Sequence, residues 1–415
     1  MALNRSRLVY IVPVTLLTAA IAAWLVWRLV IAPVPGPLRV TPARLSDLPG
    51  WAATDPSLAL AAFGRSCTAL ARRPPAATMG AGGYGGTVAD WLPACAAVPT
   101  GPVGAAAARM WFERWFEPAA VSAGRVHEGL FTGYYEPLIK GSHARHGPYQ
   151  TPVYGVPNDL IRVDLGRFRP QWAHDHLAGR LKGHELVPYP DRAQIDAASL
   201  KTAPVLFYAA DPISLFFLQI QGSGIVEFAD GSRAAVRYGA QNGRPYTAIG
   251  RTLIKEGAIA RDQVSLQSIR AWLQTHKNQA RRVMETDQSY VFFRLRPIAD
   301  PALGSPGTEG VDLTPRASLA VDPRLHPLGA PFFVVTTVPA ADPDKPARPY
   351  ARLLVAQDTG GAIGGAVRGD VFWGHGKAAQ EIAGRMKSRG RLYVLLPKPV
   401  AARLGRGRMI PGTAP

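Results

Sequence analysis

The chain has 415 residues, more than one ordinary hydrophobic core holds, so two folded domains are expected. Its 42 glycines and 38 prolines interrupt long helices and favour a body of short strands joined by turns. The 47 Lys and Arg against 29 Asp and Glu give a net charge of +18, which attracts polyanions, while the presence of only two cysteines excludes a cysteine-rich zinc site and a disulfide-dense scaffold.

The N-terminal segment indicates a membrane anchor. Residues 8–27 carry no charge and are long enough to cross a bilayer as a helix. Arg5 and Arg7 precede them, which keeps the N-terminus cytoplasmic, and Trp24 and Trp27 suit the membrane interface. We therefore expect residues 1–30 to anchor a periplasmic body to the inner membrane. A cleaved signal peptide, leaving an outer-membrane-associated body, is the alternative.

A proline-rich linker at residues 31–56 precedes two predicted helices, at 57–73 and 103–116. Cys67 and Cys95 lie in this region. An oxidising compartment would allow one disulfide between them, and the alternative is that both are small buried hydrophobic residues.

From about residue 130 the sequence pattern changes to short apolar or alternating runs separated by turn residues, and these runs predict strands. Two of them form a hairpin through the turn at 229–232. Single helices are predicted at 263–285 and 377–386, and a basic tail follows at 401–415. The predicted strands include PVLFYAA (204–210), SLFFLQIQGSG (214–224), IVEF (225–228), RAAVRY (233–238), PFFVVTTV (331–338), RLLVAQ (352–357) and RLYVLLP (391–397).

Three aspartates near the C-terminus are candidates for chemistry. Asp322 opens a proline-bounded turn that ends at Gly329, whereas Asp358 and Asp370 lie at strand ends beside glycines and aromatic residues. An aspartate before Gly or Pro is usually a turn former, and we assign Asp322 to that structural role. Asp358 and Asp370 are kept as catalytic candidates.

Five motifs occur in order over about residues 110–398. The combination resembles the membrane-bound lytic murein transglycosylase A family, whose C-terminal "3D" domain is named for three aspartates. The N-terminus departs from that pattern, because members are often lipoproteins and no cysteine lies near residue 30. The motifs are FTGYYEP (131–137), FFLQIQGSG (216–224), YGAQNGRPYTAIG (238–250), SLAVDPRLHPLG (318–329) and AQDTGGAIGGAVRGDVFWGHG (356–376).

The resemblance implies a mainly β fold with a few helices. A double-psi β-barrel domain would form from both chain ends, residues 57–137 and 239–400, with the 3D region at 310–398. Residues 138–238 would be a smaller inserted β-domain, and the substrate groove would lie between the two domains.

The resemblance also implies an activity. The enzyme would cleave the β-1,4 bond between N-acetylmuramic acid and N-acetylglucosamine in peptidoglycan and leave 1,6-anhydromuramic acid ends. Asp370 would act as acid and then base, with Asp358 beside it. One carboxyl suffices because the muramic acid's own C6 hydroxyl is a tethered nucleophile. Burial beside Phe372 and Trp373 and the charge of Asp358 would raise the pKa of Asp370.

The same motifs supply candidate saccharide-binding residues. Aromatic rings would stack on sugars, polar side chains would bond hydroxyl and acetamido groups, and glycines let a ligand approach the backbone. Alternation in the expected strand FFLQIQ favours Gln219 and Gln221, whereas about half of the set could instead be core or turn residues. The set is Thr132, Tyr134, Tyr135, Gln219, Gln221, Gly222, Ser223, Gly360, Gly361 and Trp373.

Two other functions stay open at this point. Asp358-Thr359-Gly360 matches the aspartic-protease signature, but a single copy would require a dimer. A non-catalytic barrel that binds the wall is the second alternative. The expected partners are peptidoglycan glycan strands, the membrane and cell-wall synthesis proteins, with the chain a monomer. Scattered basic residues and histidines without HxxxH spacing predict no nucleic acid, metal or cofactor.

Overall fold

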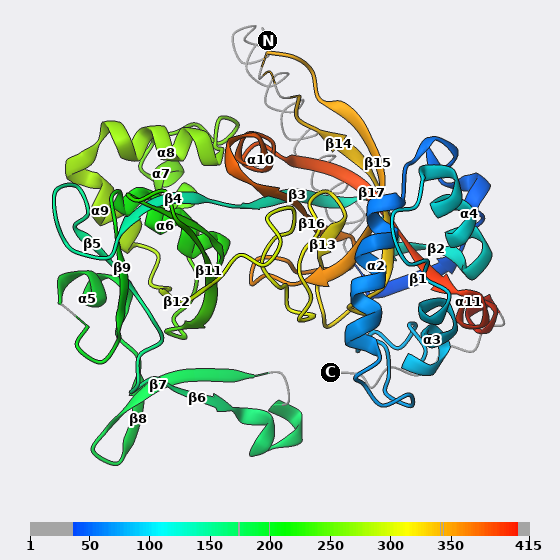
Figure 1. Ribbon diagram of the computed structural model, residues 1–415, viewed down its shortest axis with the longest axis horizontal. Helices are drawn as coiled ribbons and strands as arrows, with labels where there is room; N and C mark the ends of the chain where they lie inside the picture. The colour runs from blue at the N-terminus through cyan, green and yellow to red at the C-terminus, as the bar shows by residue number, and fades with distance from the viewer. Residues whose placement is uncertain (1–35, 173–174, 199, 341, 343, 406–415) are drawn as a thin grey trace, which may run out of the picture.

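The computed structural model describes residues 36–172, 175–198, 200–340, 342 and 344–405, which form two lobes and a projecting arm (Figure 1). The expected membrane segment, residues 1–30, lies outside the described residues, as do 31–35 of the linker and 406–415 of the tail. Within the described ranges, no helix combines the length and the apolar character that a membrane span requires.

The larger lobe is a closed barrel. Eight strands follow the order β1-β2-β17-β14-β15-β13-β16-β3, and an added pairing of β17 with β3 closes the last six into a ring. The mainly β class is thereby confirmed, and the double-psi crossing stays a prediction. The strands are β1 (Leu38–Pro42), β2 (Phe116–Ala123), β3 (Gly129–Glu136), β13 (Ser318–Ala320), β14 (Pro331–Val338), β15 (Arg348–Asp358), β16 (Arg368–His375) and β17 (Lys387–Pro397).

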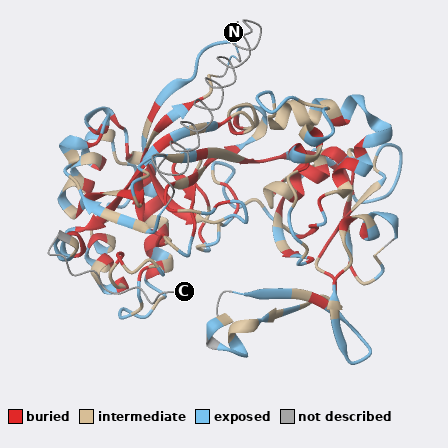
Figure 2. Cartoon of the chain, turned by 180° about the vertical axis from the view of Figure 1, so that it is seen from behind, coloured by how far each residue is buried: buried red, intermediate tan, exposed pale blue. Residues whose placement is uncertain are grey.

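Long stretches of β14, β15 and β17 are buried on both faces, which explains their continuous apolar runs. On β14, Phe332, Phe333 and Val334 are all fully buried, so side chains on both sides of the strand are covered. The interior face packs the barrel, and helices from the N-terminal segment cover the outside (Figure 1). Figure 2 shows buried residues along these strands and a second group in the smaller lobe.

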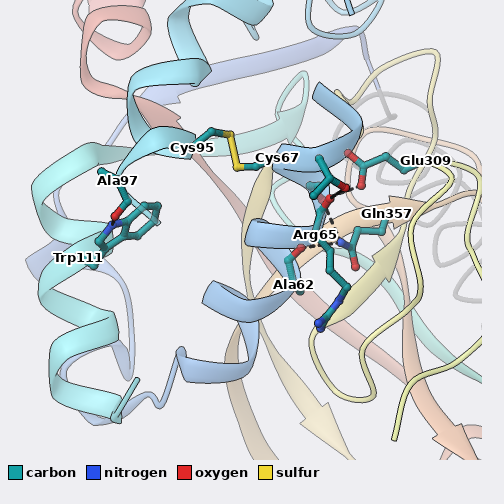
Figure 3. Close-up of a disulfide and its surroundings, with 10 residues drawn as sticks. Ala62, Arg65, Cys67, Cys95, Ala97, Trp111, Glu309 and Gln357 are labelled. Carbon is teal, nitrogen blue, oxygen red and sulfur yellow. Dashed lines mark hydrogen bonds between the residues drawn. A yellow bond between two sulfur atoms is a disulfide. The ribbon is translucent and has the colours of Figure 1, made fainter. Parts of the chain in front are cut away.

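Three helices pack on the barrel, and a disulfide joins two of them (Figure 3). The Cys67–Cys95 bond, left open by the sequence, connects the first helix to the second. Phe63 is fully buried, and its ring lies 5.5 Å from that of Phe116 at the start of β2. The helices expected at 57–73 and 103–116 are confirmed with slightly shorter bounds. They are α2 (Ser57–Leu70), α3 (Val88–Ala96) and α4 (Ala105–Trp115), with α10 (Gly376–Ala383) and α11 (Lys398–Gly405) nearer the C-terminus.

The smaller lobe is built on a six-stranded sheet of order β12-β11-β10-β4-β9-β5. The expected hairpin is confirmed as the antiparallel pair β10 and β11. The elements of this lobe are β4 (Leu138–Ser142), β5 (Thr151–Tyr154), α5 (Arg192–Ala197), β9 (Val205–Ala209), α6 (Pro212–Gln221), β10 (Gly224–Phe228), β11 (Arg233–Gln241), α7 (Ile249–Lys255), α8 (Leu266–Thr275), α9 (Lys277–Glu285) and β12 (Val291–Arg296).

The inserted lobe extends further along the chain than residues 138–238. The expected boundary falls inside β11, and β12 pairs with β11 from Val291↔Gln241 to Arg296↔Ala235. Strand pairing across about fifty residues keeps the intervening helices α7, α8 and α9 in this lobe. The sequence could not show this boundary, because hydrogen-bonded partners so far apart leave no local signal.

Two further elements differ from expectation. The run 214–224 is not a strand, because Pro212–Gln221 forms α6: Asp211 caps its first turn by accepting from the backbone N–H groups of Ile213 and Ser214, and Gly222 ends it with a φ of 81°. The single helix expected at 263–285 is two, α8 and α9, which meet at His276 with non-helical backbone.

A three-stranded arm projects from the smaller lobe and is largely exposed (Figure 2). It carries exposed apolar side chains, including Phe168 and Leu181. The arm packs on the smaller lobe at Gly243, where a Cβ atom would lie 2.7 Å from the Ala178 side chain. Its strands are β6 (Ile161–Asp164), β7 (His176–Lys182) and β8 (Glu185–Pro188).

Candidate active site

A cleft of about 810 Å³ opens between the two lobes. Strands β3, β13, β15 and β16 line it from the barrel, together with the loops at 305–308 and 359–363, while α6, β11 and β12 line it from the inserted lobe. Both catalytic candidates, Asp358 and Asp370, contribute to its wall. The parallel strands β3 and β16 pair beside the cleft. Strand β3 then continues directly into the inserted lobe as β4, so it connects the two walls of the cleft (Figure 1).

Asp370 accepts a hydrogen bond that belongs to a short chain of hydrogen bonds between β3 and β16. It lies on β16 in register with Thr132 on β3, and the Thr132 hydroxyl donates to its Oδ1 at 2.7 Å. The same hydroxyl accepts from Nη2 of Arg368 at 2.9 Å. Since a hydroxyl has one proton, the Arg368 donor directs the Thr132 proton toward the carboxyl.

Burial raises the pKa of Asp370 to about 6, because a carboxylate loses hydration inside the cleft wall. The guanidinium of Arg368 and the Thr132 hydrogen bond oppose this rise, and the charge of Asp358 adds to it. A carboxyl with such a pKa is partly protonated near neutral pH and can donate its proton to a substrate oxygen.

Asp358 differs from Asp370 because both of its oxygens are engaged. Oδ1 accepts from the backbone N–H and from the hydroxyl of Thr308, each at 3.0 Å, and Oδ2 accepts from the Tyr134 hydroxyl at 3.0 Å. Burial raises the pKa of Asp358, and these hydrogen bonds partly offset that rise because they favour the carboxylate. Asp358 therefore organises the loop and the tyrosine around Asp370.

The loop at 305–308 lies directly on β15. A Cβ atom at Gly307 would come within 2.4 Å of the Gln357 carbonyl oxygen, so only glycine allows this approach. Glu136, at the end of β3, accepts from the Ser305 backbone N–H at 2.7 Å and from the Ser223 hydroxyl at 3.2 Å. One buried carboxylate thus ties the loop and the inserted lobe to the barrel.

The predicted saccharide residues divide into two groups. Those that line the cleft are Tyr134, Gln219, Gln221, Gly222, Ser223, Gly360 and Gly361. The others do not line it. Thr132 holds the carboxyl of Asp370, as described above.

Tyr135 and Trp373 are buried in the barrel core, only 2% and 9% exposed. Side chains alternate between the two faces of a strand. Tyr135 is one position from the cleft residue Tyr134 on β3, and Trp373 is three positions from Asp370 on β16, so both point to the face opposite the cleft. Trp373 packs against Tyr350, with ring centroids 5.8 Å apart. The expectation that these two rings stack on sugars is therefore wrong.

The two glutamines reach the cleft from α6 instead of from a strand. Oε1 of Gln219 accepts from the buried guanidinium of Arg192, whose charge is balanced by Asp287 at 3.6 Å. Oε1 of Gln221 accepts from the Tyr135 backbone N–H at 3.1 Å, which attaches the helix to β3. Both side chains also position the inserted lobe.

Asp322 has the expected structural environment. It is 1% exposed, pairs with Arg324 at 2.8 Å and accepts from the Gly365 backbone N–H at 2.9 Å. Gly329 ends the turn with a φ of 87°, which favours glycine. Asp322 therefore ties the turn to the glycine-rich loop that follows Asp358.

Several cleft residues were missed by the sequence reading. Tyr238 and Tyr246, 50% and 48% exposed, begin and lie within the motif YGAQNGRPYTAIG, which should have suggested them as sugar-stacking rings. Thr308 lies in a loop without any motif. Three arginines on β11 and β12 also face the cleft, namely Arg237, Arg294 and Arg296.

Comparisons with known proteins agree along most of the chain. The family model described as the MltA specific insert domain matches residues 130–294, and that of the 3D domain matches residues 317–396. Membrane-bound lytic murein transglycosylase A of Escherichia coli (strain K12) is 33% identical over 299 residues, 71% of this chain and 72% of that protein. The Vibrio cholerae protein of the same name is 31% identical over 271 residues, 64% of this chain and 65% of that protein.

Solved structures show the same architecture. MltA from Neisseria gonorrhoeae superposes with a TM-score of 0.72 at 34% identity, covering 88% of this chain and 94% of that one. A membrane-bound lytic murein transglycosylase from Agrobacterium tumefaciens gives 0.75 at 31% identity, with 88% and 99% covered. E. coli MltA with bound chitohexaose gives 0.60 at 25% identity, with 88% and 95% covered.

Proposed function

The chain belongs to the membrane-bound lytic murein transglycosylase A family, and we propose that it cleaves peptidoglycan glycan strands with Asp370 as general acid and then general base. Members of that family are peptidoglycan-cleaving lyases, so this chain is an enzyme of the cell wall. The single observation that carries the catalytic assignment is the partly buried carboxyl of Asp370, with its pKa raised to about 6, in the wall of the cleft.

The reaction needs only one exchangeable proton. Protonated Asp370 gives its proton to the glycosidic oxygen as the bond from that oxygen to C1 of N-acetylmuramic acid breaks, releasing the N-acetylglucosamine hydroxyl. The C6 hydroxyl of the muramic acid then attacks C1 and closes a 1,6-anhydro ring. The Asp370 carboxylate takes the proton of that hydroxyl and returns to its starting state. No water is consumed, because the nucleophile is part of the substrate.

The environment of Asp358 argues against an aspartic protease. In that class, two carboxylates share one proton across a direct contact. Within the described ranges, no hydrogen bond joins Asp358 to Asp370, and Asp358 is occupied by Thr308 and Tyr134. The negative charge of Asp358 instead contributes to the raised pKa of Asp370.

The cleft walls suit a glycan. Tyr134, Tyr238 and Tyr246 offer rings for sugar faces, while Gln221 and Ser223 offer hydrogen-bonding groups, and all five line the cleft. The relative from E. coli binds chitohexaose, a chain of β-1,4-linked N-acetylglucosamine. We expect the glycan to lie along this cleft, with the scissile bond at Asp370.

Membrane association follows from the family, whose members are named membrane-bound. We propose that residues 8–27 provide it and that the body lies in the periplasm. The disulfide between Cys67 and Cys95 supports an oxidising compartment.

The decisive experiment is mass spectrometry of the products released from purified sacculi. We expect the wild-type chain to release muropeptides with 1,6-anhydro ends and Asp370→Asn to lose activity by about 10²–10⁴-fold, the usual contribution of a general acid–base group. Asp262→Asn, in an exposed loop outside the cleft, is the matched control. Reducing ends would show attack by water, and binding of sacculi without release would indicate a wall-binding barrel.

A further inference from the structure

Three arginines form a basic face on the inserted lobe, across the cleft from the two aspartates. Arg237 on β11 is the direct cross-strand partner of Arg294 on β12, and Arg296 follows two residues later on the same face. All three line the cleft. We call this set the arginine face.

The placement of these side chains opposes stability. Like charges directly opposite one another on adjacent strands destabilise a sheet. Charged residues often protect an exposed sheet edge, but β11 is an inner strand between β12 and β10, so edge protection does not account for Arg237. A functional role is the better explanation for the Arg237–Arg294 pair.

The arginine face lacks an internal counter-charge. No salt bridge joins any of its three members to an acidic side chain within the part of the chain that the structure describes. Nη1 of Arg237 is shielded from solvent and has no hydrogen-bond partner among the described residues. An unpaired buried donor on a cation is costly, and an anion that enters the cleft would satisfy it.

The other charges of the cleft are already matched. Arg192 is paired with Asp287, Asp358 is held by Thr308 and Tyr134, and Asp370 by Thr132. The cleft is therefore polarised, with a proton-donating wall on the barrel and an anion-binding wall on the inserted lobe.

The guanidinium fork matches a carboxylate, which it binds through two parallel hydrogen bonds. The sugar rings of the glycan are uncharged, whereas the peptide stems attached to muramic acid carry free carboxylates. We propose that the arginine face binds the carboxylates of the peptide stem, so that the enzyme selects glycan strands that still bear their peptides. This proposal rests on the proposed function, because it assumes that the glycan occupies the cleft.

Equilibrium binding of soluble glycan strands tests it. All chains carry Asp370→Asn so that the strands stay intact, and the test variant adds Arg294→Gln and Arg296→Gln. The control adds Arg261→Gln and Arg348→Gln, two exposed arginines outside the cleft, so that both variants lose the same net charge. Thermal melts of each variant establish that it is folded, and Arg294→Lys with Arg296→Lys tests whether charge alone restores binding.

Three strand preparations separate the sources of the carboxylate. The first keeps native stems, the second has its stem carboxyls converted to amides, and the third has its stems removed by an amidase, which leaves the lactyl carboxylate of muramic acid. We expect the double Gln variant to bind native strands about tenfold more weakly, as two lost charge-assisted contacts imply, and to bind the other two preparations like its parent. The control should change binding of native strands by less than about twofold.

Two outcomes would overturn the proposal: equal weakening on amidated strands, or a loss that persists on amidase-treated strands and so identifies the lactyl carboxylate. The proposed function is tested separately, by release of anhydro-muropeptides from the chain with Asp370 intact. The binding measurements can thus contradict stem binding by the arginine face while the catalytic proposal holds. If the chain released no anhydro-muropeptides, the binding of the three preparations could still be compared.

Discussion

Thr132 donates a hydrogen bond of 2.7 Å from its hydroxyl to Oδ1 of Asp370. The two residues are 238 positions apart in the chain, yet they lie in register on the parallel strands β3 and β16. This bond stabilises the carboxylate, whereas burial favours the protonated form. The pKa of about 6 is the balance of the two effects, and it can be shifted in either direction by changing the neighbours of Asp370.

Replacing Thr132 by Val should move the basic limb of the pH–rate profile upward. The threonine bond lowers the pKa of Asp370, so its loss raises that pKa above about 6. The acid form is present below the pKa and disappears as the pH rises through it, so activity should persist to higher pH. Initial rates on soluble strands between pH 4 and about pH 9 measure the limb, a range set by a carboxyl shifted by a unit or more. Thr132→Ser keeps the hydroxyl and should keep the limb, whereas an unmoved limb in Thr132→Val would show that this bond does not tune the acid.

Replacing Tyr134 by Phe should move the same limb downward. The Tyr134 hydroxyl favours the ionised form of Asp358, so its loss raises the pKa of Asp358. A more protonated Asp358 exerts less negative charge on Asp370, and that charge is one of the terms that raise the pKa of Asp370. The pH–rate profile of Tyr134→Phe, measured beside that of Thr132→Val, should therefore shift in the opposite direction. If the basic limbs of Tyr134→Phe and Thr132→Val moved in the same direction, the coupling between the two aspartates would be contradicted.

Loss of the disulfide should destabilise the barrel lobe. The Cys67–Cys95 bond closes a loop with a sequence separation of 28, for which the chain-entropy relation gives about 3–4 kcal/mol. The adjacent residue Ser66 accepts from Gln357, the neighbour of Asp358, so α2 also supports the strand end that carries the site (Figure 3). Urea unfolding of Cys67→Ser/Cys95→Ser, compared with the oxidised and the reduced wild type, measures the loss. Identical midpoints for all three would mean that the bond contributes nothing.

Strands β14, β15 and β17 could be predicted from the sequence because they are continuous apolar runs bounded by turn residues, as in PFFVVTTV at β14, whereas the closed barrel was implied by the family resemblance. The strand prediction was wrong at α6, because Leu218, Gln219, Ile220 and Gln221 alternate apolar and polar side chains as a half-buried strand does. The cap that decides for the helix is a single residue, Asp211, followed by Pro212. An N-cap aspartate before proline was the available signal.

Asp358 and Asp370 could be found from the sequence because Asp358 ends a strand before a glycine-rich loop and Asp370 follows Gly369 near the start of the next strand, but their pKa values and hydrogen-bond partners could not. Thr308 binds Asp358 from a loop whose position depends on Gly307 lying against β15. Arg294 faces Arg237 only because β12 returns to pair with β11 after three helices. Contacts between such distant segments are set by the whole fold and leave no local pattern.

Glu309 should make stability depend on pH near neutrality. Its Oε2 accepts from the Ser66 hydroxyl at 2.6 Å, while its Oε1 is shielded from solvent and has no hydrogen-bond partner among the described residues. Burial raises the pKa of Glu309 from 4.5 to about 7. The folded state thus holds this proton more tightly than the unfolded chain does. The stabilisation is complete below about pH 4.5 and is lost as the pH rises through about 7.

Glu309→Gln keeps an acceptor for Ser66 and cannot ionise, so it isolates this effect. At pH 5 we expect the free energy of unfolding of the variant to be close to that of the wild type. At pH 8 we expect it to be about 1–3 kcal/mol higher than that of the wild type, because the wild type must then bury a carboxylate or release the loop. Urea unfolding at pH 5, 6, 7 and 8 measures the difference between the two chains, which cancels titrations that they share, such as those of Asp196 and Asp370. A constant difference across this range would show that Glu309 ionises without a cost in the folded barrel.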